Sequence, residues 1–540
     1  MRWIRALSLI VVVLSLWFFL DTAQIGHAGS RAVHPKILEP TQLGKVNFPT
    51  SCSTIAQPTM EKGVALLHSF QYMQSEQTFT EATQQDPHCA MAQWGKAMAI
   101  YHQLWDFPEG NALREGREDL QEAAKIGGTT AREAEYISAA AVFYQDKSDL
   151  THTARTLAYS SAMEKLYRDS PNDTDAAAFY ALSLIALAEY GENDLANRKK
   201  ALAVLDPLLV TQPEHPGVAH YIIHASDTPE LASEGLLAAR MYAKIAPDSS
   251  HAIHMPSHIF TRLGLWQESI DSNIAASASA AKATEMHLSE AHYETHAMDF
   301  LDYAYLQSGQ EAKAHAVVND LKTVPGANHW TVGDMQATLE ARNAIELHHW
   351  KEAASLEVPN IPLRDQGMSY WAKAIGAARS GDVDGAKQDI QKLIEANDAQ
   401  DLHQKGMGDK VYPGEGVQQR EAEAWLAYAE GRSAEAVKGM RLAAEREESE
   451  HVESLTIPAR EMLGDLFLEL KKPSEALTEY QAALKISPKR FDELYGAARA
   501  AESAGNSREA RDYYAQLAKI AGPAADRPEL QEAKVNLAEK

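Results

Sequence analysis

The chain has very little cysteine and no excess of basic residues. Only Cys52 and Cys89 occur among 540 residues, which excludes a disulfide-rich scaffold and any zinc or iron–sulfur site built from cysteines alone. Lys and Arg number 51 against 75 Asp and Glu, a formal net charge of −24. Because nucleic acids bind basic surfaces, this balance excludes nucleic acid as the main partner. Glycine, at 30 residues, is too sparse for a collagen-like chain.

Long apolar runs are also missing, except at the N-terminus. Arg2 and Arg5 precede a 15-residue apolar run from Ala6 to Leu20, and Gly26-His27-Ala28 follows it. This pattern predicts a signal peptide over residues 1–28 and an exported protein, periplasmic or secreted, with no stable membrane anchor after cleavage. An uncleaved anchor is the alternative, although a spanning helix needs about 20 apolar residues. Export would permit a Cys52–Cys89 disulfide, and free buried thiols remain the other possibility.

Apolar residues at helical spacing fill nearly all of the chain after residue 58. Strand-like alternation is absent, so the sequence predicts an all-α protein. The clearest repeat is C-terminal, where four positions recur after 34 residues: Gly464 and Ala498, Ala476 and Ala510, Tyr480 and Tyr514, Ile486 and Ile520. A helix–turn–helix unit of this length, with small residues where helices cross and Tyr in the second helix, resembles the tetratricopeptide repeat (TPR).

A recurring turn between helices extends this resemblance along the chain. In this turn a glycine stands four or five residues before a Glu-Ala, Glu-Ser or Gly-Ala pair, as at Gly264, Gly381, Gly431 and Gly505. Two further turns have the same spacing but carry His348 or Lys471 in place of the glycine. The resemblance implies a TPR-like α-solenoid of antiparallel helix pairs with one continuous core and a concave face that binds a protein or peptide. Whether the array is one solenoid or two stays open.

The domain organisation follows from these patterns. We expect a signal peptide, an extended proline-containing arm, divergent helical repeats, TPR-like repeats, a glycine-rich loop and C-terminal TPR repeats, over residues 1–28, 29–58, 59–250, 251–396, 397–417 and 418–540. A histidine-rich segment, 215–296, crosses the junction between the divergent repeats and the TPR-like repeats that follow them.

Histidine is the feature that a plain scaffold does not explain. Nine of the 21 histidines fall within the 82 residues 215–296, where an even spread over 540 residues would place about three. Spacings of three, four or seven residues put them on common helix faces. Neutral imidazole binds transition metals such as zinc, copper or iron. The candidate metal ligands are His220, His224, His251, His254, His258, His292 and His296.

Several alternatives remain for this histidine set. Seven histidines exceed the four ligands of one tetrahedral site, so there are two metals, or some residues bind substrate, or the set is a packing network. Asp227, Glu290 and Asp299 are candidates to orient the rings by hydrogen bonds. Pro256 either kinks one helix between His251 and His258 or starts a new one. His292-Tyr-Glu-Thr-His296 is not the H-E-x-x-H protease motif, because Glu294 is rotated about 100° from the needed position.

Two functional hypotheses follow. The first is a non-catalytic exported TPR scaffold that binds a protein or peptide partner. The second is a metalloprotein or metalloenzyme whose site lies within residues 220–296. The strings His215-Pro-Gly-Val-Ala-His220 and His251-Ala-Ile-His254-Met-Pro-Ser-His258 resemble those of large exported bacterial TPR proteins, which supports the predicted fold and location but indicates no reaction.

Overall fold

The computed structural model describes residues 42–105, 107–147, 150–190, 194–285, 291–407, 416–450, 455 and 457–538. Every regular element in these ranges is a helix, so the all-α prediction is confirmed. The first helices are α1 (Gln57–His68), α2 (Tyr72–Gln85), α3 (Ala90–Ile100), α4 (Gly110–Ile126), α5 (Ala131–Phe143), α6 (His152–Asp169), α7 (Thr174–Tyr190), α8 (Asp194–Thr211), α9 (Pro216–Ser226), α10 (Ala232–Ile245), α11 (Ser250–His254), α12 (Pro256–Arg262) and α13 (Trp266–Glu285).

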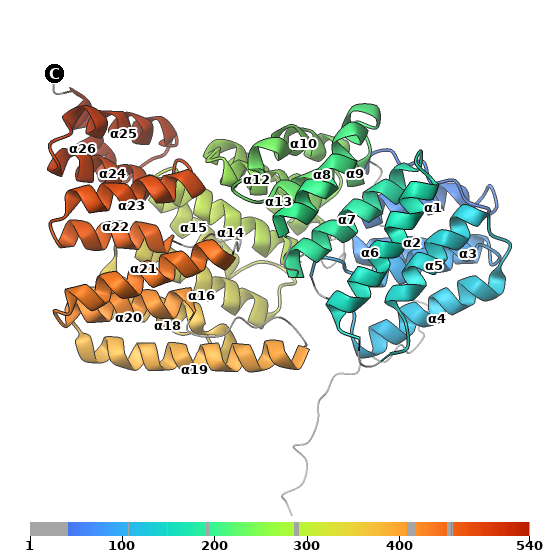
Figure 1. The fold of residues 1–540 in the computed structure, drawn as a ribbon, viewed down its shortest axis with the longest axis horizontal. Helices are drawn as coiled ribbons and strands as arrows, with labels where there is room; N and C mark the ends of the chain where they lie inside the picture. The colour runs from blue at the N-terminus through green and yellow to red at the C-terminus, as the bar shows by residue number, and fades with distance from the viewer. Residues whose placement is uncertain are drawn as a thin grey trace, which may run out of the picture. The chain divides into compact units, whose positions relative to one another are not determined.

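The second part of the chain continues in the same way. Its elements are α14 (Ala291–Gln307), α15 (Glu311–Leu321), α16 (His329–Glu346), α17 (Trp350–Ala354), the 3-10 turn η1 (Leu363–Asp365), α18 (Gly367–Ser380), α19 (Val383–Met407), α20 (Val417–Ala429), α21 (Ser433–Glu450), α22 (Ala459–Glu469), α23 (Pro473–Ile486), α24 (Phe491–Ser503), α25 (Ser507–Ile520) and α26 (Glu529–Ala538). Consecutive helices pack most closely on each other, and Figure 1 shows α20 to α24 stacked in sequence order.

The packing of Tyr480 explains the 34-residue repeat. Its fully buried ring lies between α22 and α24, where a Cβ added at Gly464 or Gly496 would come within 2.8 or 2.4 Å of the ring. Its hydroxyl donates to Asp465 Oδ1 at 2.5 Å. Small residues therefore recur where helices cross because a tyrosine from the intervening helix fills the space between them. The predicted TPR-like helix pairs are confirmed in this region.

The predicted turns also form as expected. Gly264, Gly381, Gly431 and Gly505 have positive φ values between 61° and 86°. His348 and Lys471 adopt φ values of 55° and 56° at the two turns that lack glycine. The left-handed backbone is therefore a property of the repeat, and the non-glycine residues accept a conformation that costs roughly 1–2 kcal/mol.

The apolar core is not continuous, contrary to the solenoid expectation. Three large clusters of buried apolar residues lie within 48–260, 266–347 and 341–533. Contacts also join helices far apart in the sequence, since α1 packs on α9 and α14 packs on α24. The Nε1 atom of Trp266 donates to the carbonyl oxygen of Lys489 at 2.8 Å, for example. Distant repeats are therefore coupled, which a simple linear array would not allow.

Two of the predicted boundaries change. The loop prediction for 397–417 is wrong for residues 397–407, because α19 continues to Met407 and its helical hydrogen bonds outweigh the glycines that follow. Residues 42–56 of the predicted arm contain no regular helix, and α1 starts at Gln57. The signal peptide, and the arm up to residue 41, lie outside the described residues. Within the described part of the chain, no helix is both long and apolar enough to cross a membrane.

The extended arm is attached to the first helices by a disulfide. Cys52 pairs with Cys89, the residue that precedes α3, which decides the alternative left open by the sequence. Nearby, Phe48 is fully buried and stacks on Trp94 of α3 with ring centroids 5.4 Å apart. The arm is therefore part of the N-terminal core.

Candidate metal centre

Four helices bring the predicted histidines together. Helix α9 is buried along its whole length and carries His220 and His224, one turn apart. Helices α11 and α12 carry His251, His254 and His258, and α14 carries His296. Pro256 is the first residue of α12, so the chain breaks into two short helices there instead of continuing through a kink. His251 and His254 both lie on α11, before this break. The His251 ring contacts His220 of α9, whereas His254 pairs with His258 across the break and lies near His296 of α14.

The first triad consists of His220, His224 and His251, all buried. The Nε2 atom of His220 lies 3.1 Å from the Nε2 atom of His251 and 3.1 Å from that of His224. The Nδ1 atom of His220 lies 2.7 Å from the carbonyl oxygen of His68, which can only accept, so this nitrogen carries the proton. The Nε2 atom of His220 therefore presents a lone pair to two other imidazoles at once.

The second triad consists of His254, His258 and His296. The Nδ1 atom of His254 donates to Asn273 Oδ1 at 2.7 Å, and the Nδ1 atom of His258 donates to Asp227 Oδ2 at 2.9 Å. The Asn273 amide is oriented by its own Nδ2, which donates to the carbonyl oxygen of Ser269 at 2.9 Å. Both Nε2 atoms thus carry lone pairs, yet they lie 3.0 Å apart. His296 offers a ring nitrogen within 4.8 Å of both.

This geometry matches a set of metal ligands more closely than a set of hydrogen bonds. Two lone pairs that face each other repel unless a cation lies between them. Two nitrogens that are each about 2.0–2.1 Å from one tetrahedral metal ion lie about 3.3 Å apart. The partners on the other ring nitrogens, a carbonyl, an amide and a carboxylate, are those that orient metal-binding histidines in proteins.

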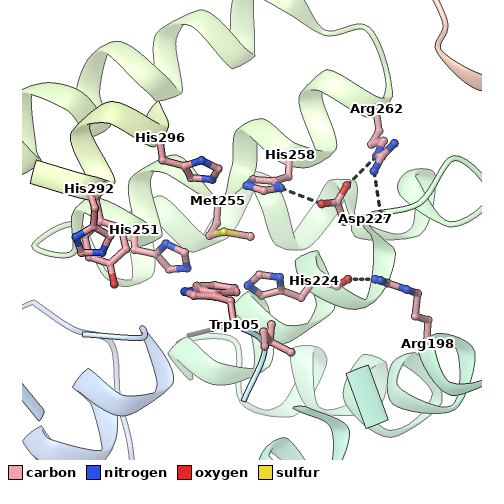
Figure 2. A pocket seen from close by; sticks show the side chains of 12 residues that line it. Trp105, Arg198, His224, Asp227, His251, Met255, His258, Arg262, His292 and His296 are labelled. Atoms are coloured by element: carbon pink, nitrogen blue, oxygen red, sulfur yellow. Dashed lines mark hydrogen bonds and ion pairs between the residues drawn. The ribbon is translucent and has the colours of Figure 1, made fainter. Parts of the chain in front are cut away.

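Both triads border one cavity of about 380 Å³. Figure 2 shows His224, His251, His258 and His296 around it, with Met255 between them. Trp105, whose side chain is 41% exposed, lies beside His224 and His251 at ring-centroid distances of 5.9 and 6.1 Å. The ligand set can therefore be reached by a small molecule, and a tryptophan limits the size of what enters.

Two arginines and one aspartate hold the cavity wall. Arg262 Nε donates to Asp227 Oδ1 at 2.8 Å, so this carboxylate links His258 to Arg262. Arg198 Nη1 donates to the carbonyl oxygen of His224 at 2.7 Å and fixes the end of α9. The guanidinium of Arg262 and the His258 ring help to keep the pKa of Asp227 far below its usual value despite burial, and the group is ionised at neutral pH.

Burial keeps the imidazoles neutral. Desolvation lowers the pKa of His220 to about 3 and lowers the pKa values of His224, His251 and His254 well below 6.5. Neighbouring imidazoles lower them further, because each protonated ring would repel the others. Neutral rings are the form that binds metal.

A third histidine cluster beside the triads has a different character. His68 Nε2 lies 2.9 Å from Asp175 Oδ1, His215 Nε2 lies 3.3 Å from the same oxygen, and His68 Nδ1 lies 3.0 Å from the Tyr221 hydroxyl. Every close approach here joins a donor to an acceptor. We interpret this cluster as a structural network that positions His68, whose carbonyl oxygen holds the His220 ring.

The other residues predicted for the site have mixed positions. His292 lies on the exposed side of α14 and lines the cavity, but it belongs to neither triad. Asp227 lies where a ring-orienting acceptor was predicted. Asp299 does not, because its carboxylate pairs with Arg342 Nη2 at 2.5 Å on the neighbouring α16. Glu290 lies outside the described residues. Glu294 does not line the cavity.

Sequence reasoning missed Asn273 and the carbonyl oxygen of His68. Neither residue is marked by a histidine-like spacing, and a backbone carbonyl leaves no trace in side-chain type. Asn273 lies one and two residues from Ser272 and Asp271 in an ordinary polar stretch of α13. Only its complete burial marks Asn273 as a site residue, and burial is seen in the structure and not in the sequence.

Comparisons with known proteins assign neither a family nor a function to this chain. No protein-family model matches the chain, and no curated protein is similar to it. Among solved structures, human IFIT1 bound to m7Gppp-AAAA is 12% identical, covering 85% of this chain and 95% of its own, with a TM-score of 0.36. Yeast Tom70 is 11% identical over 89% and 95%, with a TM-score of 0.31. A tetratricopeptide repeat protein from Parabacteroides merdae is 14% identical over 53% and 97%, with a TM-score of 0.29.

Proposed function

We propose that this chain is a metalloprotein, in which a scaffold of helix pairs holds transition metal ions at the two histidine triads. The observation that carries the proposal is the second triad, where two Nε2 atoms with fixed lone pairs lie 3.0 Å apart. A shared proton could relieve one such pair. A metal ion, by contrast, takes all three imidazoles of a triad as ligands at once.

The supporting contacts favour a metal over a packing network. A network of neutral imidazoles needs alternating donors and acceptors, as the cluster around Asp175 has. At His220, His254 and His258 the ring donors point outward, to His68, Asn273 and Asp227, and the lone pairs point inward. This arrangement would cost stability in a protein that binds no cation there, because buried polar atoms without a suitable partner are destabilising.

Export from the cytoplasm is the second part of the proposal. It is supported by the apolar run that precedes Gly26-His27-Ala28 and by the Cys52–Cys89 disulfide, since structural disulfides persist in oxidising compartments. Binding of a protein or peptide partner, which the TPR resemblance implies, stays a prediction. The metal centre lies inside the array and leaves its outer faces available for such a partner.

Elemental analysis of purified protein tests the metal proposal. The full-length chain is expressed with export, treated with chelator, and refilled separately with zinc, copper, nickel and ferrous iron. The variants His224→Phe and His258→Phe each remove one ligand, keep an aromatic ring, and place it beside an existing cavity. The matched control is His88→Phe, whose parent histidine is exposed in a turn.

We expect bound metal and a raised melting temperature in the wild type and the control, and less bound metal in both ligand variants. A metal that binds only the folded state raises the free energy of unfolding by RT ln(1 + [L]/Kd). This is about 2.7 kcal/mol when the free metal concentration is a hundred times Kd. If none of the four metals binds to the folded wild type, the proposal is wrong.

A further inference from the structure

The two triads are close enough to act together. The rings of His224 and His258, one from each triad, have centroids 6.5 Å apart, and so do those of His251 and His254. Within the first triad, the rings of His224 and His251 are 6.3 Å apart. Other pairs within a triad are closer, such as His254 and His296 at 4.6 Å, but the spacing between the triads is nearly that of the widest pair within one. Both sets border one cavity. Metal ions in both sites would face each other across it.

The charge of the cavity limits which metal ions it can hold. All six ligands are imidazoles, which bring no negative charge to a bound cation. Asp227 is the one carboxylate among the described residues that line the cavity, and it is already paired with Arg262 and His258. Arg198, the other arginine of the wall, is paired with Asp194, so the wall has no spare carboxylate to offset a bound cation. Two divalent ions would bring four uncompensated charges into this buried space, which is costly, whereas two monovalent ions bring two.

Copper is the metal that fits both the charge and the ligands. Imidazole suits copper, and copper has the highest affinity of the divalent first-row series for a given nitrogen site. Cu(I) carries one charge and accepts three ligands, while zinc takes four in structural sites. Each triad supplies three nitrogens.

We propose, on the basis of the metal centre above, that the two triads hold one pair of copper ions and that this pair binds dioxygen in the cavity. Two Cu(I) ions each give one electron to O2, which becomes bound peroxide, O2²⁻, while both copper ions become Cu(II). The O–O double bond becomes a single bond, and copper–oxygen bonds form. No proton and no other reductant is needed for this step, and release of dioxygen reverses it.

The cavity favours such a ligand. Dioxygen is small and apolar, and can pass Trp105 and the apolar side chains of Leu104 and Met255 that line the cavity. Once reduced, it carries two negative charges, which offset the two charges added when the copper ions are oxidised.

The experiment uses full-length protein filled with Cu(I) under nitrogen and then exposed to dioxygen. We expect two copper ions per chain, uptake of one O2 per two copper ions, a new near-ultraviolet absorption band, and little Cu(II) paramagnetic resonance signal because the two ions are coupled. His258→Phe, in the second triad, should keep about one copper ion and take up no O2. His88→Phe should behave as the wild type.

The outcomes separate this inference from the metal proposal. If two copper ions bind but take up no O2, or show the strong signal of isolated Cu(II), the paired centre is wrong and the metalloprotein proposal stands. The same holds if zinc or another metal displaces an equal amount of copper. If the folded wild type binds no metal of any kind, both proposals fail.

Discussion

At the scale of single residues, the decisive feature is which ring nitrogen carries the proton. His220, His254 and His258 each donate through Nδ1 to an acceptor that cannot donate in return: a carbonyl oxygen, an amide oxygen held by its own donor, and an ionised carboxylate. These outer contacts place lone pairs on all three Nε2 atoms. The site is therefore specified as much by the acceptors behind the rings as by the histidines.

Asn273→Leu tests this role of the outer contacts. Leucine has a similar size but cannot accept the proton of His254 Nδ1, so the tautomer and ring orientation are no longer fixed. We expect metal affinity to fall about 10- to 100-fold, the usual effect of losing such a contact, with all six ligands still present. The control is Asn319→Leu, because the exposed Asn319 makes the same local bond to the carbonyl four residues before it. Equal metal affinity in both variants would contradict this role for Asn273.

At the scale of helices, small residues determine how closely pairs approach. Tyr480 occupies the space left by Gly464 and Gly496. At the site, α11 gives His251 to the first triad and His254 to the second, and α12 adds His258 to the second. Helix spacing in the sequence predicted that His251, His254 and His258 share one face. His251 instead contacts His220 of α9, while His254 and His258 pair with each other, so the spacing identified the right residues and the wrong grouping.

Gly496→Ala should destabilise the C-terminal repeats. The added methyl group would come within 2.4 Å of Tyr480, and overpacking of this kind costs about 1–3 kcal/mol. Gly439→Ala is the matched control, since its Cβ would lie 3.4 Å from Ala424 in ordinary contact. There alanine should be neutral or stabilising by up to about 1 kcal/mol, because it is the better helix former. Denaturant unfolding of both variants measures the difference, and equal stabilities would refute the packing argument.

At the scale of the whole molecule, polar contacts join the apolar clusters. Arg490 is fully buried and contacts three carboxylates. They belong to Glu346 of α16 at 3.0 Å, Glu461 of α22 at 3.0 Å and Glu493 of α24 at 2.5 Å. It also contacts the hydroxyl of Tyr303 on α14. Three carboxyl groups around one guanidinium cannot all ionise without leaving excess negative charge in the core. Burial accordingly raises the pKa of Glu493 to about 7, with Glu346 adding to the rise.

Glu493→Gln should change how stability depends on pH. The folded protein holds the Glu493 proton up to about pH 7, whereas the unfolded chain loses it near pH 4.5, so ionisation of this group lowers the free energy of unfolding as pH rises between these values. Buried neutral histidines act in the opposite direction, so the quantity to measure is the difference between variant and wild type.

We expect Glu493→Gln to gain stability relative to the wild type between pH 4.5 and 7, by up to about 3 kcal/mol at 1.36 kcal/mol per pKa unit. Glu445→Gln, at an exposed position, is the control and should show no such trend. A difference that does not vary with pH would mean that Glu493 is ionised throughout this range.

The sequence predicted the fold well and the site in part. The 34-residue spacing around Tyr480 and the left-handed turns are local patterns, so they could be recognised without the structure. The six triad histidines were identified from their number and spacing. Their division into two triads, the contact of His68 with His220, and the pairing of Asp299 with Arg342 depend on contacts between residues 40 to 150 positions apart, which local periodicity does not encode. The contacts of α14 with α24 were missed for the same reason.

Anomalous diffraction from crystals of the metal-filled protein is the most direct test of the central claim. Data collected above and below the absorption edge of the bound metal locate it without assumptions about the ligands. We predict one peak between the Nε2 atoms of His220, His224 and His251, and a second among the ring nitrogens of His254, His258 and His296. Density for water alone at both places, or metal bound only to surface histidines such as His88, would contradict the account.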